Sequence, residues 1–142
     1  MGITTGTSGL GTLIKIGNGA STEVFTTIAE VKSISGPNLA REMLEATHME
    51  SPNGYREYLP SFKDAGEVTL EVNFLPGDLG QKGLVTDYNN GTRRNFKIVW
   101  PNTAHTTWSY SGYITGFQPS AAVGDMLAAS VTIKVTGDVT LS

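Results

Sequence analysis

The clearest structural signal in the sequence is PSFKDAGEVTLEVNF, residues 60–74, because its second half alternates without interruption. The apolar positions are Val68, Leu70, Val72 and Phe74, and the polar positions are Glu67, Thr69, Glu71 and Asn73. A period of two is typical of a β-strand with one buried face. The sequence therefore predicts a strand over residues 67–75, and it leaves open what the polar face contacts.

Composition limits the classes of protein to consider. A chain of 142 residues forms one domain with a substantial core. Its 17 glycines and its charged fraction of 16% favour a strand-rich globular protein. A net charge of −3 gives no electrostatic basis for holding phosphates. With no cysteine, no membrane-length apolar run and no signal-peptide pattern at the start, we expect a soluble protein that is not exported.

The other elements follow from shorter patterns. Further strands are expected over residues 12–17, 23–35, 94–100, 106–117 and 126–141. The segment 23–35 also fits a helical spacing. A helix is expected over 78–90, where Asp78 can cap the start, Gln81 can complete a capping box and Gly91 can end it. These elements predict a mainly β fold, a two-sheet sandwich or barrel flanked by one helix.

Three segments are less regular. Residues 1–11 are mostly Gly, Thr and Ser and are expected to form a flexible arm ahead of a single domain over 12–142. Residues 38–47 have the composition of a helix and the alternation of a strand. Residues 48–66 contain two prolines and two glycines, which predict a long loop.

Few residues suggest a catalytic or metal-binding site. His48 and His105 are isolated, and each is near a turn, so neither predicts a metal site. No serine lies in a nucleophile elbow. Glu67 and Glu71 lie about 13 Å apart along an extended strand, beyond the separation of a glycosidase pair. We therefore expect a protein without catalytic activity and without a cofactor.

The order of features over residues 33–74 resembles the major tail tube protein family of long-tailed bacteriophages. The shared features are Gly36-Pro37, Glu45-Ala46-Thr47, Ser51-Pro52, the GYREY segment at 54–58 and Asp64-Ala65-Gly66. The resemblance continues through the helix at 76–90, FKIVWPN and SVTIKVTGDVTL, and so covers most of the chain.

This resemblance implies a structural virion protein. Six copies would join their inner sheets into a ring, and rings would stack into the tube through which DNA enters the host. Residues 41–48 would then be a strand, and the flexible N-terminal segment 1–11 would become ordered when rings stack. The residues expected to face the lumen are Glu45, Glu67, Thr69, Glu71 and Asn73. The residues expected at ring-stacking or inter-subunit contacts in the 48–66 loop are His48, Tyr55, Arg56, Tyr58, Leu59, Phe62, Lys63 and Asp64.

The same resemblance implies the partners: further copies of the chain, a tape measure protein, a tail terminator, distal tail or baseplate proteins and DNA in transit, with no membrane. It places the protein in the virion tail after assembly in the host bacterial cytoplasm. Two alternatives remain. One is the tube of a contractile tail or secretion-system ring. The other is a monomeric carbohydrate-binding or adhesin β-sandwich that uses Trp100, Trp108 and Tyr113.

Overall fold

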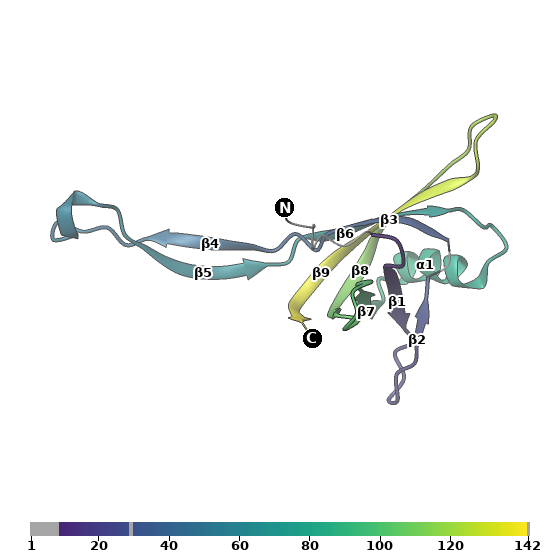
Figure 1. Cartoon of the computed structure of the whole chain (residues 1–142), viewed down its shortest axis with the longest axis horizontal. Helices are drawn as coiled ribbons and strands as arrows, with labels where there is room; N and C mark the ends of the chain where they lie inside the picture. The colour runs from purple at the N-terminus through teal and green to yellow at the C-terminus, as the bar shows by residue number, and fades with distance from the viewer. Residues whose placement is uncertain (1–8, 29, 142) are drawn as a thin grey trace, which may run out of the picture.

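The computed structural model describes residues 9–28 and 30–141, in which nine strands and one α-helix form a mainly β fold with two sheets. The strands are β1 (Leu13–Gly17), β2 (Phe25–Thr27), β3 (Val31–Ser35), β4 (Ala40–Glu45), β5 (Tyr58–Asp64), β6 (Glu67–Asn73), β7 (Arg93–Val99), β8 (Thr107–Ser120) and β9 (Ala128–Leu141). Seven strands form one sheet in the order β2-β1-β7-β8-β9-β6-β3, and β4 pairs with β5 (Figure 1). The expected class is confirmed.

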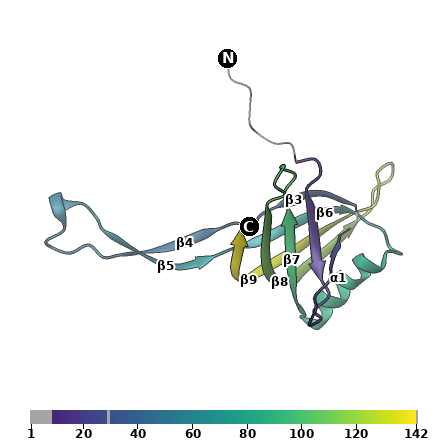
Figure 2. The same ribbon diagram turned by 60° about the horizontal axis from the view of Figure 1, so that its bottom comes forward.

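The large sheet curls on itself. β2 and β3 lie at its opposite edges, yet the connection from Thr27 to Val31 spans at most about 14 Å. The two edges must therefore come close together, which gives the body the barrel-like shape seen in Figure 2. The single strand expected over 23–35 is wrong. The chain leaves the β1 edge after Ile28, whose amide donates to Ile14, and Glu30 takes a positive φ of 59°.

The core lies inside this curled sheet. The alternation of β6 is confirmed, because Val68, Leu70 and Val72 are fully buried while Glu67, Thr69 and Glu71 are exposed. β9 pairs with β6 and adds Val131 and Ile133 to the same interior. The remaining large core residues are Ile14, Ile28, Leu84, Phe96, Ile98, Tyr110, Ile114 and Val135.

The helix expected over 78–90 is confirmed as α1 (Leu79–Asn90), apart from its capping box. The Asp78 carboxylate accepts a hydrogen bond from the Gln81 amide at 3.0 Å, and Gly91 ends the helix in the left-handed conformation. The Gln81 side chain does not complete a capping box. Its amide group instead donates to the Asn73 carbonyl and accepts from the Leu75 amide. This buried side chain therefore ties the helix to the end of β6.

The loop expected over 48–66 is wrong in its second half. Tyr58–Asp64 is a strand that pairs with β4, so residues 40–64 form a long hairpin rather than a strand followed by a loop. The strand type inferred for the ambiguous 38–47 segment is confirmed, with Ala40–Glu45 as its bounds. Pro60 is tolerated because β5 has a free edge, and a bulge lies close to it. Figure 1 shows this hairpin projecting away from the body.

The chain before β1 is described from Gly9 onward. Residues 9–12 form a turn in which the Thr12 amide donates to the Gly9 carbonyl. The rest of the expected N-terminal arm, residues 1–8, lies outside the described residues. Among the residues that are described, no helix is both long and apolar enough to cross a membrane.

Candidate assembly surfaces

The first candidate surface is the outer face of β6 and its neighbours. The pairing with β9 puts Glu67 opposite Lys134 and Thr69 opposite Thr132. It also puts Glu71 opposite Ser130. Side chains on directly opposed residues point to the same side of a sheet. The polar side chains of β6 and β9 therefore form one surface, on the opposite side of the sheet from the core.

This surface extends over the strands on either side. β8 contributes Tyr113, Gly116 and Gln118, which lie opposite these three residues of β9, and Ser120, which lies opposite Ala128. β3 contributes Ser33 and Ser35, opposite Glu71 and Thr69. The four-stranded stretch β8-β9-β6-β3 thus has an outer face rich in hydroxyl groups. We call it the polar face.

The charges on the polar face are few. On β6 and β9 it has the carboxylates of Glu67 and Glu71 and the ammonium of Lys134. The Lys134 Nζ also lies 3.9 Å from a carboxylate oxygen of Asp64, with both side chains largely exposed. An exposed pair at this distance contributes little to stability. The polar face is therefore a weakly acidic surface rather than a cluster of like charges.

The structure brings together four of the five residues expected in the lumen. Glu67, Thr69, Glu71 and Asn73 share the outer side of β6. Asn73 also donates to Glu30, 3.0 Å from its carboxylate, at the edge of the face. Glu45 does not join them, because it ends β4 and lies opposite Tyr58 on the projecting hairpin.

The second candidate surface is the hairpin formed by β4 and β5, which we call the arm (residues 40–64). Leu44 lies directly opposite Leu59, and Met43 lies opposite Pro60 on the other side of the ribbon. All four are exposed, and Phe62 is 80% exposed. An isolated two-stranded hairpin is marginally stable in water. Apolar side chains on both sides of such a ribbon indicate that the arm contacts other protein surfaces.

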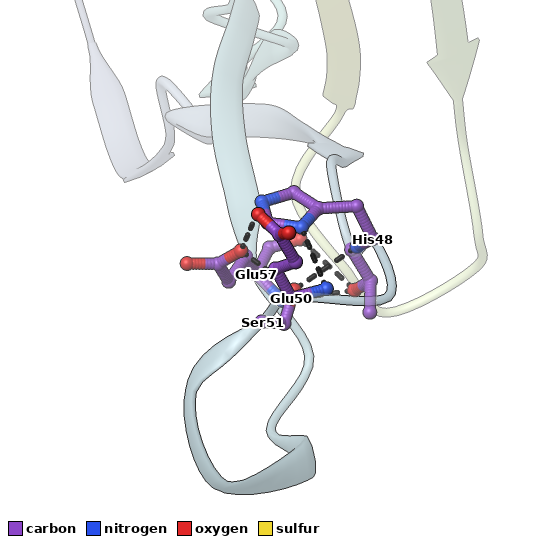
Figure 3. A network of polar contacts seen from close by, with 5 residues as sticks. His48, Glu50, Ser51 and Glu57 are labelled. Atoms are coloured by element: carbon purple, nitrogen blue, oxygen red, sulfur yellow. Dashed lines mark hydrogen bonds and ion pairs between the residues drawn. The ribbon is translucent and has the colours of Figure 1, made fainter.

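The arm ends in a compact tip (Figure 3). The Ser51 hydroxyl donates to the Glu57 carboxylate at 2.7 Å and accepts from the His48 amide at 3.0 Å. His48 Nδ1 accepts from the Glu50 amide, so in the neutral imidazole Nε2 has the proton and faces Glu57 at 3.4 Å. This network fixes the turn while Met49 points into solvent.

The structure places the expected contact residues along the whole arm. His48, Tyr55 and Arg56 lie at the tip. Tyr58, Leu59 and Phe62 lie on β5, and Lys63 and Asp64 lie at the base of the arm. Sequence reasoning missed the apolar residues of β4, Met43 and Leu44. The alternation over residues 42–47 was the signal that could have found them.

The aromatic residues of the ligand-binding alternative do not form one platform. Trp100 and Trp108 meet edge to face at 5.6 Å, and both are partly buried. Tyr113 lies on the polar face, whereas Trp108 shares the side of β8 that includes the buried Tyr110. The described residues also contain no group of three or more His, Asp or Glu side chains placed to hold a metal ion.

A polar face and a projecting apolar arm suit a subunit that assembles with copies of itself. The family described as the lambda phage tail tube protein matches residues 10–142. The chain belongs to this family. It is therefore a structural protein of a bacteriophage tail tube, as the resemblance over residues 33–74 predicted. No curated protein sequence matches the chain.

Solved structures of tail tubes share the fold of this tail tube protein. The tail of an empty gene transfer agent particle aligns with a TM-score of 0.78 at 18% identity, covering 96% of this chain and 99% of that chain. A chain from the sheath/tube terminator of an extracellular contractile injection system gives 0.72 at 17% identity, with 99% of each chain covered. The SPP1 tail tube gives 0.67 at 19% identity, covering 92% of this chain and 76% of that chain.

Proposed function

We propose that six copies of the chain form a ring and that rings stack into a tail tube through which DNA passes. The observation that supports this most directly is the polar face on four consecutive strands, β8-β9-β6-β3. The other side of these four strands packs on the apolar core. The polar face is therefore free to line a channel. The similar gene transfer agent tail is described with C6 symmetry.

The dimensions agree with this proposal. If each of about six subunits contributes about four strands, the strands at a spacing of about 4.8 Å give a circumference of about 115 Å before tilt. The corresponding backbone diameter is about 37 Å. A duplex fits within this diameter after side chains are subtracted. Joining the strands around a ring would also pair the exposed sheet edges of the monomer.

The chemistry of the polar face suits a conduit. Glu67, Thr69, Glu71 and Asn73 would face the lumen, together with the Ser and Thr side chains of β9. DNA phosphates bind surfaces that supply several Lys or Arg side chains. A hydroxyl-rich and weakly acidic wall offers few such contacts and repels phosphates at short range. DNA would therefore move along the tube without being retained.

The arm would form contacts between subunits or between rings. The contact residues of this proposal are His48, Tyr55, Arg56, Tyr58, Leu59, Phe62, Lys63 and Asp64. Burial of the exposed Leu59 and Phe62 side chains against a neighbouring copy would stabilise the contact by about 1.5–3 kcal/mol for each residue. Glu45 lies on the arm, and we assign it to these contacts rather than to the lumen.

The same proposal gives the partners of the tube. A tape measure protein would occupy the lumen before DNA, and terminator and baseplate proteins would cover the two ends. Assembly would take place in the host bacterial cytoplasm. The role of the chain is structural rather than catalytic.

Size-exclusion chromatography followed by negative-stain electron microscopy tests the proposal. The purified chain is expected to form six-fold rings or tubes, in proportions that depend on protein concentration. A monomer that persists at high concentration, without rings or tubes, would overturn it. The contractile injection system chain shares the fold, so the tube of a contractile tail is the second candidate. A sheath that co-purifies with the tube would favour that candidate.

A further inference from the structure

The large sheet has a different feature at each end of β6. Glu67, at its start, follows the base of the arm, and Asn73, at its end, pairs with Ala128 at the start of β9. The Phe74 amide also donates to the Leu127 carbonyl. The turn between β8 and β9 therefore lies about 20 Å along β6 from the arm base. Figure 1 shows this turn projecting on the side of the body away from the arm.

This β8–β9 turn, residues 121–127, exposes apolar side chains. Val123 is fully exposed, and Met126 and Leu127 are 72% and 42% exposed. The turn is closed by the Asp125 amide, which donates to the Ala122 carbonyl. Within the described residues the Asp125 carboxylate forms no ion pair. The turn thus presents an apolar tip with one free negative charge.

A groove of about 660 Å³ lies at the other end, at the base of the arm. Leu39, Val139 and Leu141 give it apolar walls, and Arg41 and Lys63 line it as well. Neither of these cations forms an ion pair with a described residue. Two carboxylates also line the groove. They are Asp64 and Asp138, and the Lys134 ammonium lies 3.9 Å from Asp64, so that the groove and its rim together have one excess positive charge.

We propose that the β8–β9 turn of one copy docks in the arm-base groove of a copy in the next ring. This inference rests on the proposed stacking of rings. Met126 and Leu127 would cover the apolar walls, and the Asp125 carboxylate would meet the excess positive charge of Arg41 and Lys63. The charges of the two surfaces are complementary, and the groove is continuous with the arm.

The placement of the two features explains why a tube can lengthen. A contact between different surfaces on two identical subunits is heterologous, and it leaves an unused copy of each surface at the two ends. If the contact runs along the strand direction, it does not close on itself. Each added ring would then present a new set of grooves or turns to the next ring.

Cysteine cross-linking tests the docking, because the chain has no cysteine of its own. The variants Met126→Cys and Leu39→Cys change exposed side chains. Equal amounts of the two are diluted into an excess of the unmodified chain, so that the parent determines assembly. A short bis-maleimide reagent is then added to tubes and, separately, to unpolymerised subunits. A cross-linked dimer is expected in tubes and not in the unpolymerised sample.

The control pairs Met126→Cys with Tyr88→Cys, an exposed position on α1, and is expected to lose the dimer. Tubes of normal appearance without the 126–39 dimer would overturn the docking while leaving the proposed tube intact. A dimer of equal yield in isolated rings would assign the contact to ring closure and would also overturn it. If the unmodified chain forms neither rings nor tubes, the proposed function fails and the docking fails with it.

Discussion

Arg94 and Asp87 form a two-point ion pair that joins β7 to the helix α1. The Arg94 Nε and one terminal nitrogen donate to the two carboxylate oxygens at 3.0 and 2.9 Å. The Asp87 side chain is 6% exposed and that of Arg94 is 26% exposed. Arg94 also donates to the Asn18 carbonyl beyond β1. One guanidinium therefore links the helix, β7 and the turn after β1.

Replacing Arg94 should destabilise the subunit. Arg94→Ala leaves the buried Asp87 carboxylate without its partner, and we expect the free energy of unfolding to fall by about 2–3 kcal/mol. The pKa of the Arg94 guanidinium is raised by its hydrogen bond to Asp87. A cation whose pKa is higher in the folded than in the unfolded chain stabilises the fold fully at every pH below its unfolded pKa. The loss should therefore be the same across neutral pH.

Urea unfolding of the unassembled subunit measures this effect. The control is Arg93→Ala, which removes the same side chain from the exposed neighbouring position. We expect the control to lie within about 0.5 kcal/mol of the parent. Equal losses for the two variants would contradict the role of the ion pair.

Replacing Tyr110, in contrast, should stabilise the subunit. Its ring stacks on Phe96 at 5.5 Å, and its buried hydroxyl has no hydrogen-bond partner among the described residues. Burial raises the pKa of this phenol well above its usual value, so the group stays neutral. Tyr110→Phe removes an unpaired polar atom and keeps the stack. We expect a gain of about 1 kcal/mol in urea unfolding.

Tyr113→Phe is the matched control, because Tyr113 lies on the polar face and its side chain is exposed. It should leave the free energy of unfolding unchanged. A loss of stability in Tyr110→Phe would show that the hydroxyl has a partner in solution.

Two glycines of β8 should respond differently to alanine. A Cβ on Gly112 would lie 2.6 Å from the Lys134 carbonyl oxygen and 2.9 Å from the Ile133 side chain. A Cβ on Gly116 would be 3.6 Å from its nearest neighbours, which is ordinary contact. We expect Gly112→Ala to cost about 1–3 kcal/mol and Gly116→Ala to be tolerated. Thermal unfolding of the two variants side by side tests this, and the reverse order would contradict it.

The segments that the sequence predicted well are those with local signals. The alternation of 67–74 predicted the strand and its buried face because Val68, Leu70 and Val72 pack in the core while the side chains between them stay outside it. The Asp78 cap and the Gly91 stop predicted the helix bounds because both act on the backbone at the helix ends, within a few residues of the chain. The break within 23–35 had no such signal. The chain leaves the edge at β1 after Ile28 and joins the opposite edge at β3. The position of this break depends on the arrangement of the whole sheet.

The candidate surfaces divide in the same way. Alternation assigned the outer side of β6, but only the pairing register shows that Lys134 and the hydroxyl groups of β9 share it. β5 was hidden because Pro60 and the flanking glycines have the composition of a loop. Its partner strand is more than ten residues away, so no local pattern shows the pairing. The location of Glu45 on the arm rather than beside β6 depends on that pairing.

The arm should control assembly without controlling the fold. Leu44 and Leu59 are exposed and pair only within the arm, so Leu44→Ser/Leu59→Ser should keep the urea midpoint of the subunit. It should abolish tubes in negative-stain micrographs, because the apolar contact with a neighbour is lost. Leu44→Met/Leu59→Met keeps apolar side chains of similar volume and should retain tubes. Normal tubes from the serine variant would contradict this role.

Charge reversal on the polar face should make the tubes retain DNA. Glu67→Lys/Glu71→Lys replaces two carboxylates by two ammonium groups on each subunit, at exposed positions away from the core. Tubes should still form. A cationic wall binds phosphates and releases their counterions, so duplex DNA should co-sediment with these tubes in a salt-dependent way. Glu67→Gln/Glu71→Gln removes charge without adding any and should retain far less DNA. If the lysine and glutamine variants hold equal amounts, the polar face does not line the lumen.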